Sequence, residues 1–380
     1  MKKIDDILAC RGLFFVMAFS IGLWTIRIPT IKDQILTDYL GIGYIMATFS
    51  IGSIIMMLLA NYIIIRTSSK FVLIFVSVVQ WLLWLPVPFI NSLETFMFLA
   101  FLFGICFGLF EIALNLQASN IEIREKKSMM TVFHSFWSLG VLIGSFLTSI
   151  FLQFEISMLN NILIYVIIML PLNLWFTFKL NVDEKSSIEN KKSIFFIWPI
   201  LVILLAVVSM ASALSEGSVD SWGALYMRDI VKIDGFKIGI ATISFNIFMV
   251  IGRFYGDQFR DKIGVFNLIL CLFSLTIFSL IILINFNSII SSIIGFALLG
   301  IGTSSVIPIA YSLAGKIKGI DSGVGIAIVS VAVYGTFMGA PAALGLVANI
   351  YGVNNIFLPI LIVFVLLLFT MIVFKKEFKS

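Results

Sequence analysis

One glutamate stands inside a long apolar run of the sequence. The segment CFGLFEIALNLQ covers residues 106–117, and Glu111 within it is 17 residues from Glu94 and 11 from Glu122. In a membrane-spanning helix it would lie roughly 25 Å from one and about 16 Å from the other. A charged acid at that depth costs on the order of 2.5–3.5 kcal/mol. We expect Glu111 to load and unload a proton or contact a solute, hydrogen-bonded by Asn115 one turn on. The alternative is a structural glutamate that is permanently protonated or paired with an arginine.

A second pair of acids lies in EGSVDSW, residues 216–222. Glu216 and Asp220 are one helical turn apart and share a face. They suit a second proton site, a solute ligand or an outer-gate partner for Arg27; the alternative is solvation at the membrane interface. Arg27, in WTIRIP, either snorkels to the interface, pairs with Glu216 or binds an anionic group.

The remaining candidates are polar or aromatic side chains within apolar segments. His134 is the only histidine, and an unperturbed histidine titrates near neutrality. Three tryptophans can line a solute site by stacking on a flat ligand, or can belong to the interfacial belt. An amide in the middle of a span is a further polar contact. The predicted solute-binding residues are Asn115, Trp24, Arg27, His134, Trp137, Trp222 and Asn246.

Composition places these residues in a polytopic membrane protein. The chain of 380 residues is 61% apolar and 12% charged, against about 25% charged residues in ordinary globular proteins. Its first apolar run has no small-residue cleavage site after it, so a retained helix is expected. Three cysteines and one histidine without metal-ligand spacing predict no metal and no cofactor.

Twelve segments are long and apolar enough to span a bilayer. Of the 25 basic residues, 20 fall in inside segments if the N-terminus is cytoplasmic. The positive-inside rule therefore predicts that both termini are cytoplasmic. The spans are expected at about 8–30, 40–63, 70–90, 95–120, 130–153, 158–180, 195–217, 236–256, 265–286, 289–314, 321–348 and 353–374.

The two halves of the chain echo each other at an offset near 195 residues. ATFS at 47–50 matches ATIS at 241–244, and a glycine pair at 140 and 144 matches one at 335 and 339. We expect an all-α fold of two six-helix bundles related by a pseudo-two-fold repeat, over 1–180 and 194–380, joined by a cytoplasmic linker at 181–193. The glycines predict close helix packing, and Pro308 and Pro341 predict kinks.

The segment GRFYGDQFRDKIG, residues 252–264, resembles the cytoplasmic loop signature of the major facilitator superfamily. Asp257 takes the place of its aspartate, while Gly252 comes one residue early and Arg260 replaces its second glycine. The loop after the second span has largely lost the pattern. The resemblance implies a cytoplasmic gate formed by Arg253, Gly256, Asp257 and Arg260.

Four further motifs resemble the bacterial YbjJ-like branch of that superfamily: WTIRIP, FHSFWSLG, EGSVDSWGALYMRD and YGTFMGAPAALG. This branch is similar to the fucose–proton symporters, whose fourth span carries G-x-x-x-x-E-x-x-x-N. Here Glu111 and Asn115 are in register, with Cys106 in place of the glycine. The resemblance implies a proton-coupled solute site at Glu111 and a location in the bacterial cytoplasmic (inner) membrane.

Together these features predict a secondary active transporter of a small polar, sugar-like solute, working by alternating access and proton symport. No Walker motif appears, so ATP is not expected to drive transport; the proton is the coupling ion. Nucleic acid is not an expected partner. The fifth span lacks the Gly-Pro pair of the antiporters, which favours uptake over a proton-coupled exporter of drugs or metabolites. A membrane enzyme is not expected, and a sensor built on the same fold is a further alternative. The superfamily resemblance implies a monomer.

Overall fold

The computed structural model describes residues 2–126, 129–181, 199–314, 317 and 322–375. Within this described part every regular element is a helix, and twelve of the helical segments are long and apolar enough to cross a membrane. The predicted all-α fold with twelve transmembrane helices is therefore confirmed. The chain divides into two compact units, Met1–Ser193 and Ile194–Ser380, close to the linker predicted at 181–193.

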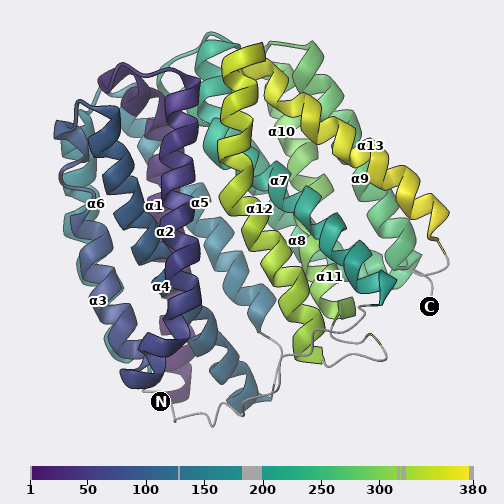
Figure 1. Cartoon of the computed structure of the whole chain (residues 1–380), viewed down its shortest axis with the longest axis horizontal. Helices are drawn as coiled ribbons and strands as arrows, with labels where there is room; N and C mark the ends of the chain where they lie inside the picture. The colour runs from purple at the N-terminus through teal and green to yellow at the C-terminus, as the bar shows by residue number, and fades with distance from the viewer. Residues whose placement is uncertain (1, 127–128, 182–198, 315–316, 318–321, 376–380) are drawn as a thin grey trace. The chain divides into compact units, whose positions relative to one another are not determined.

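The first unit contains six spanning helices (Figure 1). Helix α1 packs against α5 and α6, α2 packs against α4, and α3 packs between α4 and α6. The third span is interrupted before its outer end, where Pro86 starts a short 3-10 helix, η1. The elements are α1 (Lys2–Gln34), α2 (Tyr39–Arg66), α3 (Ser69–Leu82), η1 (Val87–Phe89), α4 (Leu93–Glu125), α5 (Met130–Gln153) and α6 (Met158–Lys179).

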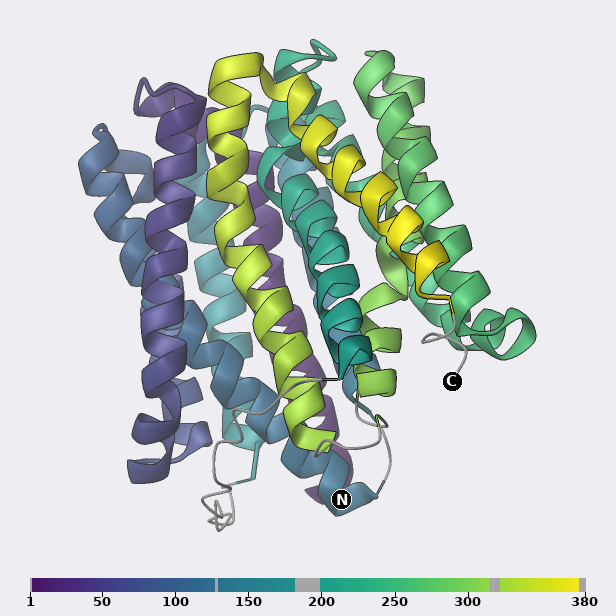
Figure 2. The ribbon, with the colours of Figure 1, turned by 45° about the vertical axis from the view of Figure 1, so that its right-hand side comes forward.

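The second unit has the same number of spans in seven helices, because its fourth span is broken into α10 and α11. Helices α7 and α12 lie side by side (Figure 2), and α10 packs against α8 and α9. The elements are α7 (Ile200–Asp229), η2 (Gly235–Gly239), α8 (Ile240–Ile263), α9 (Val265–Asn285), α10 (Ile289–Ser304), α11 (Val306–Ala314), α12 (Ser322–Tyr351), η3 (Val353–Ile356) and α13 (Phe357–Val373).

Short polar side chains start several of these helices. Asp38, Ser68, Ser92 and Ser157 each accept a hydrogen bond from a backbone N–H in the first turn of the helix that follows. Such caps satisfy donors that the first turn of a helix leaves without a partner. They explain why the spans begin where the apolar runs meet a serine or aspartate.

The predicted glycine packing holds in one half only. A Cβ added at Gly140 or Gly144 of α5 would collide with the carbonyl oxygen of Phe15 or Phe19 of α1, so α1 and α5 approach closely there. At Gly335 and Gly339 of α12, no described heavy atom lies within 4 Å of such a Cβ. The prediction of close packing is therefore wrong for the second pair. Glycines that match between the two halves of the sequence therefore need not have matching packing contacts.

Candidate functional site

Glu111 lies in the middle of α4 and is 3% exposed. The side-chain amide of Asn115 donates a hydrogen bond to Glu111 Oε1 at 2.8 Å and to the Glu111 main-chain oxygen at 2.9 Å. The i, i+4 spacing of a helix brings the two side chains together. The amide therefore holds one carboxyl oxygen in place against its own helix.

Aromatic rings from α1, α4 and α5 lie in the same unit. The ring of His134 is 5.1 Å from that of Phe14 and tilted by 57°. The ring of Trp137 meets that of Phe107 edge-on at 6.2 Å. Phe14 belongs to the buried apolar cluster of the first unit, and Phe107 and Trp137 pack against that cluster. His134 thus contacts α1, and Trp137 contacts α4, the helix that carries Glu111.

Trp24 lies apart from those ring contacts. Its ring is 6.3 Å from that of Phe96, near the outer start of α4. Phe96 is buried, whereas Trp24 is half-buried. The side chain is therefore packed on one face only, and a part of its surface stays accessible in the first unit.

Arg27 is enclosed within the first unit, with 3% of the residue exposed. Its Nε donates to Asn161 Oδ1 at 3.0 Å, and its Nη2 donates to the Ile156 carbonyl at 2.9 Å. Ile156 lies just before α6, and Asn161 lies in its first turn. The sequence predicts that Arg27 snorkels, pairs with Glu216 or holds an anion. The structure instead gives it an amide and a main-chain carbonyl as partners, and no ion pair of Arg27 occurs among the described residues.

Glu216 and Arg253 form an ion pair inside the second unit. Arg253 Nη2 of α8 lies 3.5 Å from Glu216 Oε2 of α7, and each side chain is 12% exposed. The sequence predicts Arg253 as a cytoplasmic gate residue and does not link it to Glu216. The signal that would have found the pair is that Arg253 is the only charged residue between Gly239 and Gly256. A charge inside a span requires a partner.

The break between α10 and α11 gives Arg253 a second acceptor. Pro308 has no N–H to donate to the carbonyl of Ser304 four residues earlier. That carbonyl accepts a hydrogen bond from Arg253 Nε at 3.3 Å, and Ser305 Oγ donates to the Gly252 carbonyl at 3.1 Å. The kink predicted at Pro308 is present as a broken helix, whereas α12 continues through Pro341.

Three other predicted residues lie deep in the second unit. Asp220 is one turn beyond Glu216, and its Oδ1 is buried without a hydrogen-bond partner among the described atoms. Trp222 was predicted to line a solute site, but it is fully buried, so its ring lies in the core of the unit. The amide of Asn246 donates to the Thr242 carbonyl at 2.9 Å and so binds its own helix.

The other predicted gate residues lie toward the inner end of α8. Gly256 allows that helix to approach Ser305, whose Oγ would collide with a Cβ at this position. Arg260 contacts the adjacent Asp261, with Nε 3.3 Å from Oδ1. The side chain of Asp257 lies outside the described residues. A gate formed by Arg253, Gly256, Asp257 and Arg260 stays a prediction.

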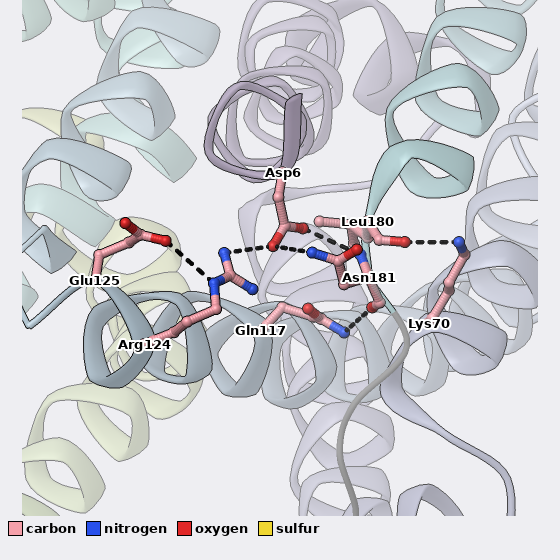
Figure 3. Close-up of polar contacts among 7 residues, drawn as sticks. All are labelled: Asp6, Lys70, Gln117, Arg124, Glu125, Leu180 and Asn181. Carbon is pink, nitrogen blue, oxygen red and sulfur yellow. Dashed lines mark hydrogen bonds and ion pairs between the residues drawn. The ribbon is translucent and has the colours of Figure 1, made fainter. Parts of the chain in front are cut away.

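A polar network that the sequence did not reveal joins the predicted inner ends of four elements of the first unit (Figure 3). Asp6 of α1, whose side chain is 1% exposed, lies 2.6 Å from Arg124 Nη2 of α4. Asp6 also accepts hydrogen bonds from the backbone N–H and the side-chain amide of Asn181, at 3.1 and 2.9 Å. Asn181 lies two residues after the end of α6, so the start of the linker predicted at 181–193 is fixed to α1.

Two further side chains hold the same segment. Gln117 of α4 donates to the Asn181 carbonyl at 3.2 Å, and Lys70 of α3 donates to the Leu180 carbonyl at 2.6 Å (Figure 3). Burial alone lowers the pKa of Arg124, but hydrogen bonds and attraction from Asp6 and Glu125 outweigh it and raise that pKa above its ordinary value. Arg124 therefore keeps its positive charge at every physiological pH.

Metal chemistry finds no support in the described part of the chain. No group of three or more histidine, cysteine, aspartate or glutamate side chains is close enough there to hold a metal ion. Among the described residues, Glu111 is a buried carboxyl group inside a span, and Glu216 and Asp220 are largely buried ones in the other unit. What they can do chemically is exchange protons and accept hydrogen bonds from a polar solute.

Related membrane proteins from other bacteria match nearly the whole chain. An uncharacterized MFS-type transporter of Yersinia pestis is 25% identical over 355 residues, which is 93% of this chain and 92% of that protein. The membrane protein MosC of Rhizobium meliloti is 24% identical over 386 residues, 99% of this chain and 91% of MosC.

Solved structures share the fold at low sequence identity. The nucleoside transporter NupG superposes with a TM-score of 0.73 at 14% identity, covering 100% of this chain and 99% of NupG. A bacterial homolog of the human lysosomal transporter Spinster, in an inward-facing and unoccupied conformation, has a TM-score of 0.75 at 11% identity over 99% of this chain and 98% of that one. The family model of the Major Facilitator Superfamily matches residues 13–264. This chain is therefore a multi-pass membrane transporter that belongs to the Major Facilitator Superfamily.

Proposed function

We propose that this transporter carries a small polar, sugar-like solute into the cell together with a proton. The observation that carries the proposal is Glu111, a carboxyl group in the middle of α4 that is 3% exposed and held by Asn115 at 2.8 Å. An ionisable side chain retained inside a span is expensive, and in transporters such groups serve proton relays and solute sites. Its place in α4 matches the fourth-span pattern that this sequence shares with the fucose–proton symporters.

The solute class follows from Asn115, the partner of this acid, and from polar and aromatic side chains elsewhere in the first unit. His134, Asn115 and the exposed part of Trp24 offer hydrogen bonds and an aromatic face, a combination that suits a hydroxylated ring. NupG, which shares the fold, is a nucleoside transporter, and a nucleoside contains a sugar ring. We therefore include nucleosides with sugars in the proposed class. The YbjJ-like motifs support the same class.

Alternating access supplies the mechanism. The two units, Met1–Ser193 and Ile194–Ser380, are compact on their own, as movement of one bundle against the other requires. In uptake, Glu111 takes its proton from the outer side and releases it inside. The excess of basic residues in inside segments supports cytoplasmic termini in the bacterial inner membrane.

Reconstitution into liposomes that enclose a pH-sensitive dye tests this proposal. A panel of sugars, nucleosides, amino acids and drugs is added outside, with protein-free liposomes as the control. We expect internal acidification that requires one of the sugars or nucleosides. Acidification driven instead by a drug leaving the liposome would make the protein an exporter. Saturable solute uptake without proton movement would contradict proton symport.

A further inference from the structure

Three charged side chains lie deep in the spans of the second unit, and their charges do not balance. Glu216 and Asp220 are on α7, and Arg253 is on α8. The other charges within these spans lie at their outer ends: Arg228 pairs with Asp229 at 2.7 Å, and Lys237 is in η2. With both acids ionised, the deep cluster would carry one negative charge in excess.

The neighbouring helices offer no charge that could correct this balance. Helices α10, α11, α12 and α13 contain no Asp, Glu, Lys, Arg or His. The titratable side chains of α11 and α12, which pack against α7, include Tyr311 and Tyr334. On α8 the next charged residue, Asp257, lies beyond the inner end of the span at Gly256. Within the second unit, binding of one proton by one of the two acids would remove this excess.

The contacts divide the two acids into different roles. Glu216 Oε2 faces Arg253 Nη2 at 3.5 Å, and Arg253 is fixed further by the Ser304 carbonyl that the helix break exposes. Asp220 Oδ1 is buried and has no hydrogen-bond donor among the described atoms. A buried ionised carboxylate without a donor is strongly disfavoured, whereas a neutral carboxylic acid carries no net charge to compensate.

We propose that the Glu216–Asp220–Arg253 cluster of the second unit binds one proton, that Asp220 carries it, and that Glu216 stays ionised as the counter-ion of Arg253. The inference deepens the proposed function and rests on it for the link to transport. It adds a second proton-binding carboxyl to Glu111, and it assigns Arg253 a positioning role that fixes which of the two acids is neutral.

Infrared difference spectroscopy of the purified protein at neutral pH tests the assignment without a known solute. The spectrum of wild type minus Asp220→Asn should show the carbonyl band of one neutral carboxylic acid. Asp229→Asn, which removes an acid paired with arginine, should show the bands of an ionised carboxylate instead. Ionised bands for Asp220→Asn would overturn the proposal. Aspartate labelled with 13C in wild type decides the same point if the variant fails to fold, because the neutral band must then shift.

Variants that change the net charge of the cluster make this experiment more decisive. In Glu216→Gln, Asp220 is the acid of this cluster that is left to pair with Arg253, so the band of the neutral carboxylic acid should disappear although Asp220 is present. In the double variant Glu216→Gln, Arg253→Gln, the band of the neutral carboxylic acid should return. A neutral band that persists in Glu216→Gln would overturn the shared-proton account.

Transport separates this inference from the proposed function. Asp220→Asn should lose proton influx by at least about tenfold, while solute counterflow stays within about twofold of wild type. A wild type that moves solute without protons would refute the proposed function, and the infrared result would still decide Asp220. A coupled wild type with an equally coupled Asp220→Asn would refute only this inference.

Discussion

The amide of Asn115 donates at 2.8 Å to Glu111 Oε1, one helical turn away. A hydrogen bond to a charged group contributes about 1.5–3 kcal/mol. If the bond orients the acid for proton transfer, replacing Asn115 by leucine should lower kcat/KM for solute-driven proton uptake by at least about tenfold. The measurement is initial uptake rate against solute concentration.

Asn285→Leu is the matched control for that change. Asn285 at the end of α9 is exposed and donates only to the carbonyl of Ile281 in its own helix. Its loss should leave kcat/KM unchanged. Equal effects of the two substitutions would show that the Asn115 amide has no particular role at Glu111.

Arg27 should contribute to stability through the two acceptors that it holds at the start of α6. Arg27→Met would leave Asn161 Oδ1 and the Ile156 carbonyl without that donor, and each buried unsatisfied group costs about 1–3 kcal/mol. A thiol-reactive dye can follow thermal unfolding, because Cys10 and Cys106 are buried. The Tm should fall clearly, whereas Arg260→Met, at an exposed pair, should leave it almost unchanged. A stable Arg27→Met protein would contradict this role.

The glycine pairs of the two halves provide a matched comparison. Gly144→Ala places a methyl group against the Phe19 carbonyl, and Gly339→Ala meets no described atom within 4 Å. Overpacking costs about 1–3 kcal/mol, so the first variant should unfold at a lower temperature and the second should not. Equal Tm values for both would mean that α1 and α5 separate without cost.

The inner polar network should show coupling between Asp6 and Arg124. Breaking a buried pair by removing one partner is strongly destabilising, by about 3–5 kcal/mol. Arg124 is 35% exposed, so solvent screening should reduce the effect to about 1–2 kcal/mol. A double-mutant cycle with Asp6→Ala and Arg124→Ala, read as free energy of unfolding, measures it.

The same cycle has a defined pH dependence on the arginine side. A cation whose folded pKa is raised contributes stability below its unfolded pKa and loses it only as pH rises through the folded one. For Arg124 the folded pKa is raised above the ordinary value of an arginine, which is already far above the physiological range. The coupling energy should therefore be the same at about pH 7 and about pH 9. A decline over that range would mean that another group provides the positive charge.

The sequence predicted the spans well because hydropathy and length decide them. Twelve spans were expected and twelve occur among the described residues, and Glu111 lies in the middle of the fourth of them, as its apolar context predicted. Pro308 gave the broken tenth span, since a missing N–H has a local consequence. These features depend on neighbours in the chain.

Features that depend on helical phase and long-range partners were not predictable in this way. Spans that are apolar on all sides do not reveal which face turns inward, so Trp222 was expected at a lining surface and lies in the core. The partners of Arg27 are more than a hundred residues away. The pair of Arg253 with Glu216 likewise joins two helices that no motif connects.

The most direct test of proton symport at Glu111 is solute-driven proton influx in proteoliposomes, compared between wild type, Glu111→Gln and Glu94→Gln. Glu94 is exposed in the first turn of the same helix, α4. The account predicts that Glu111→Gln abolishes solute-dependent proton entry while Glu94→Gln retains it. Proton entry in Glu111→Gln at the wild-type rate would contradict the account.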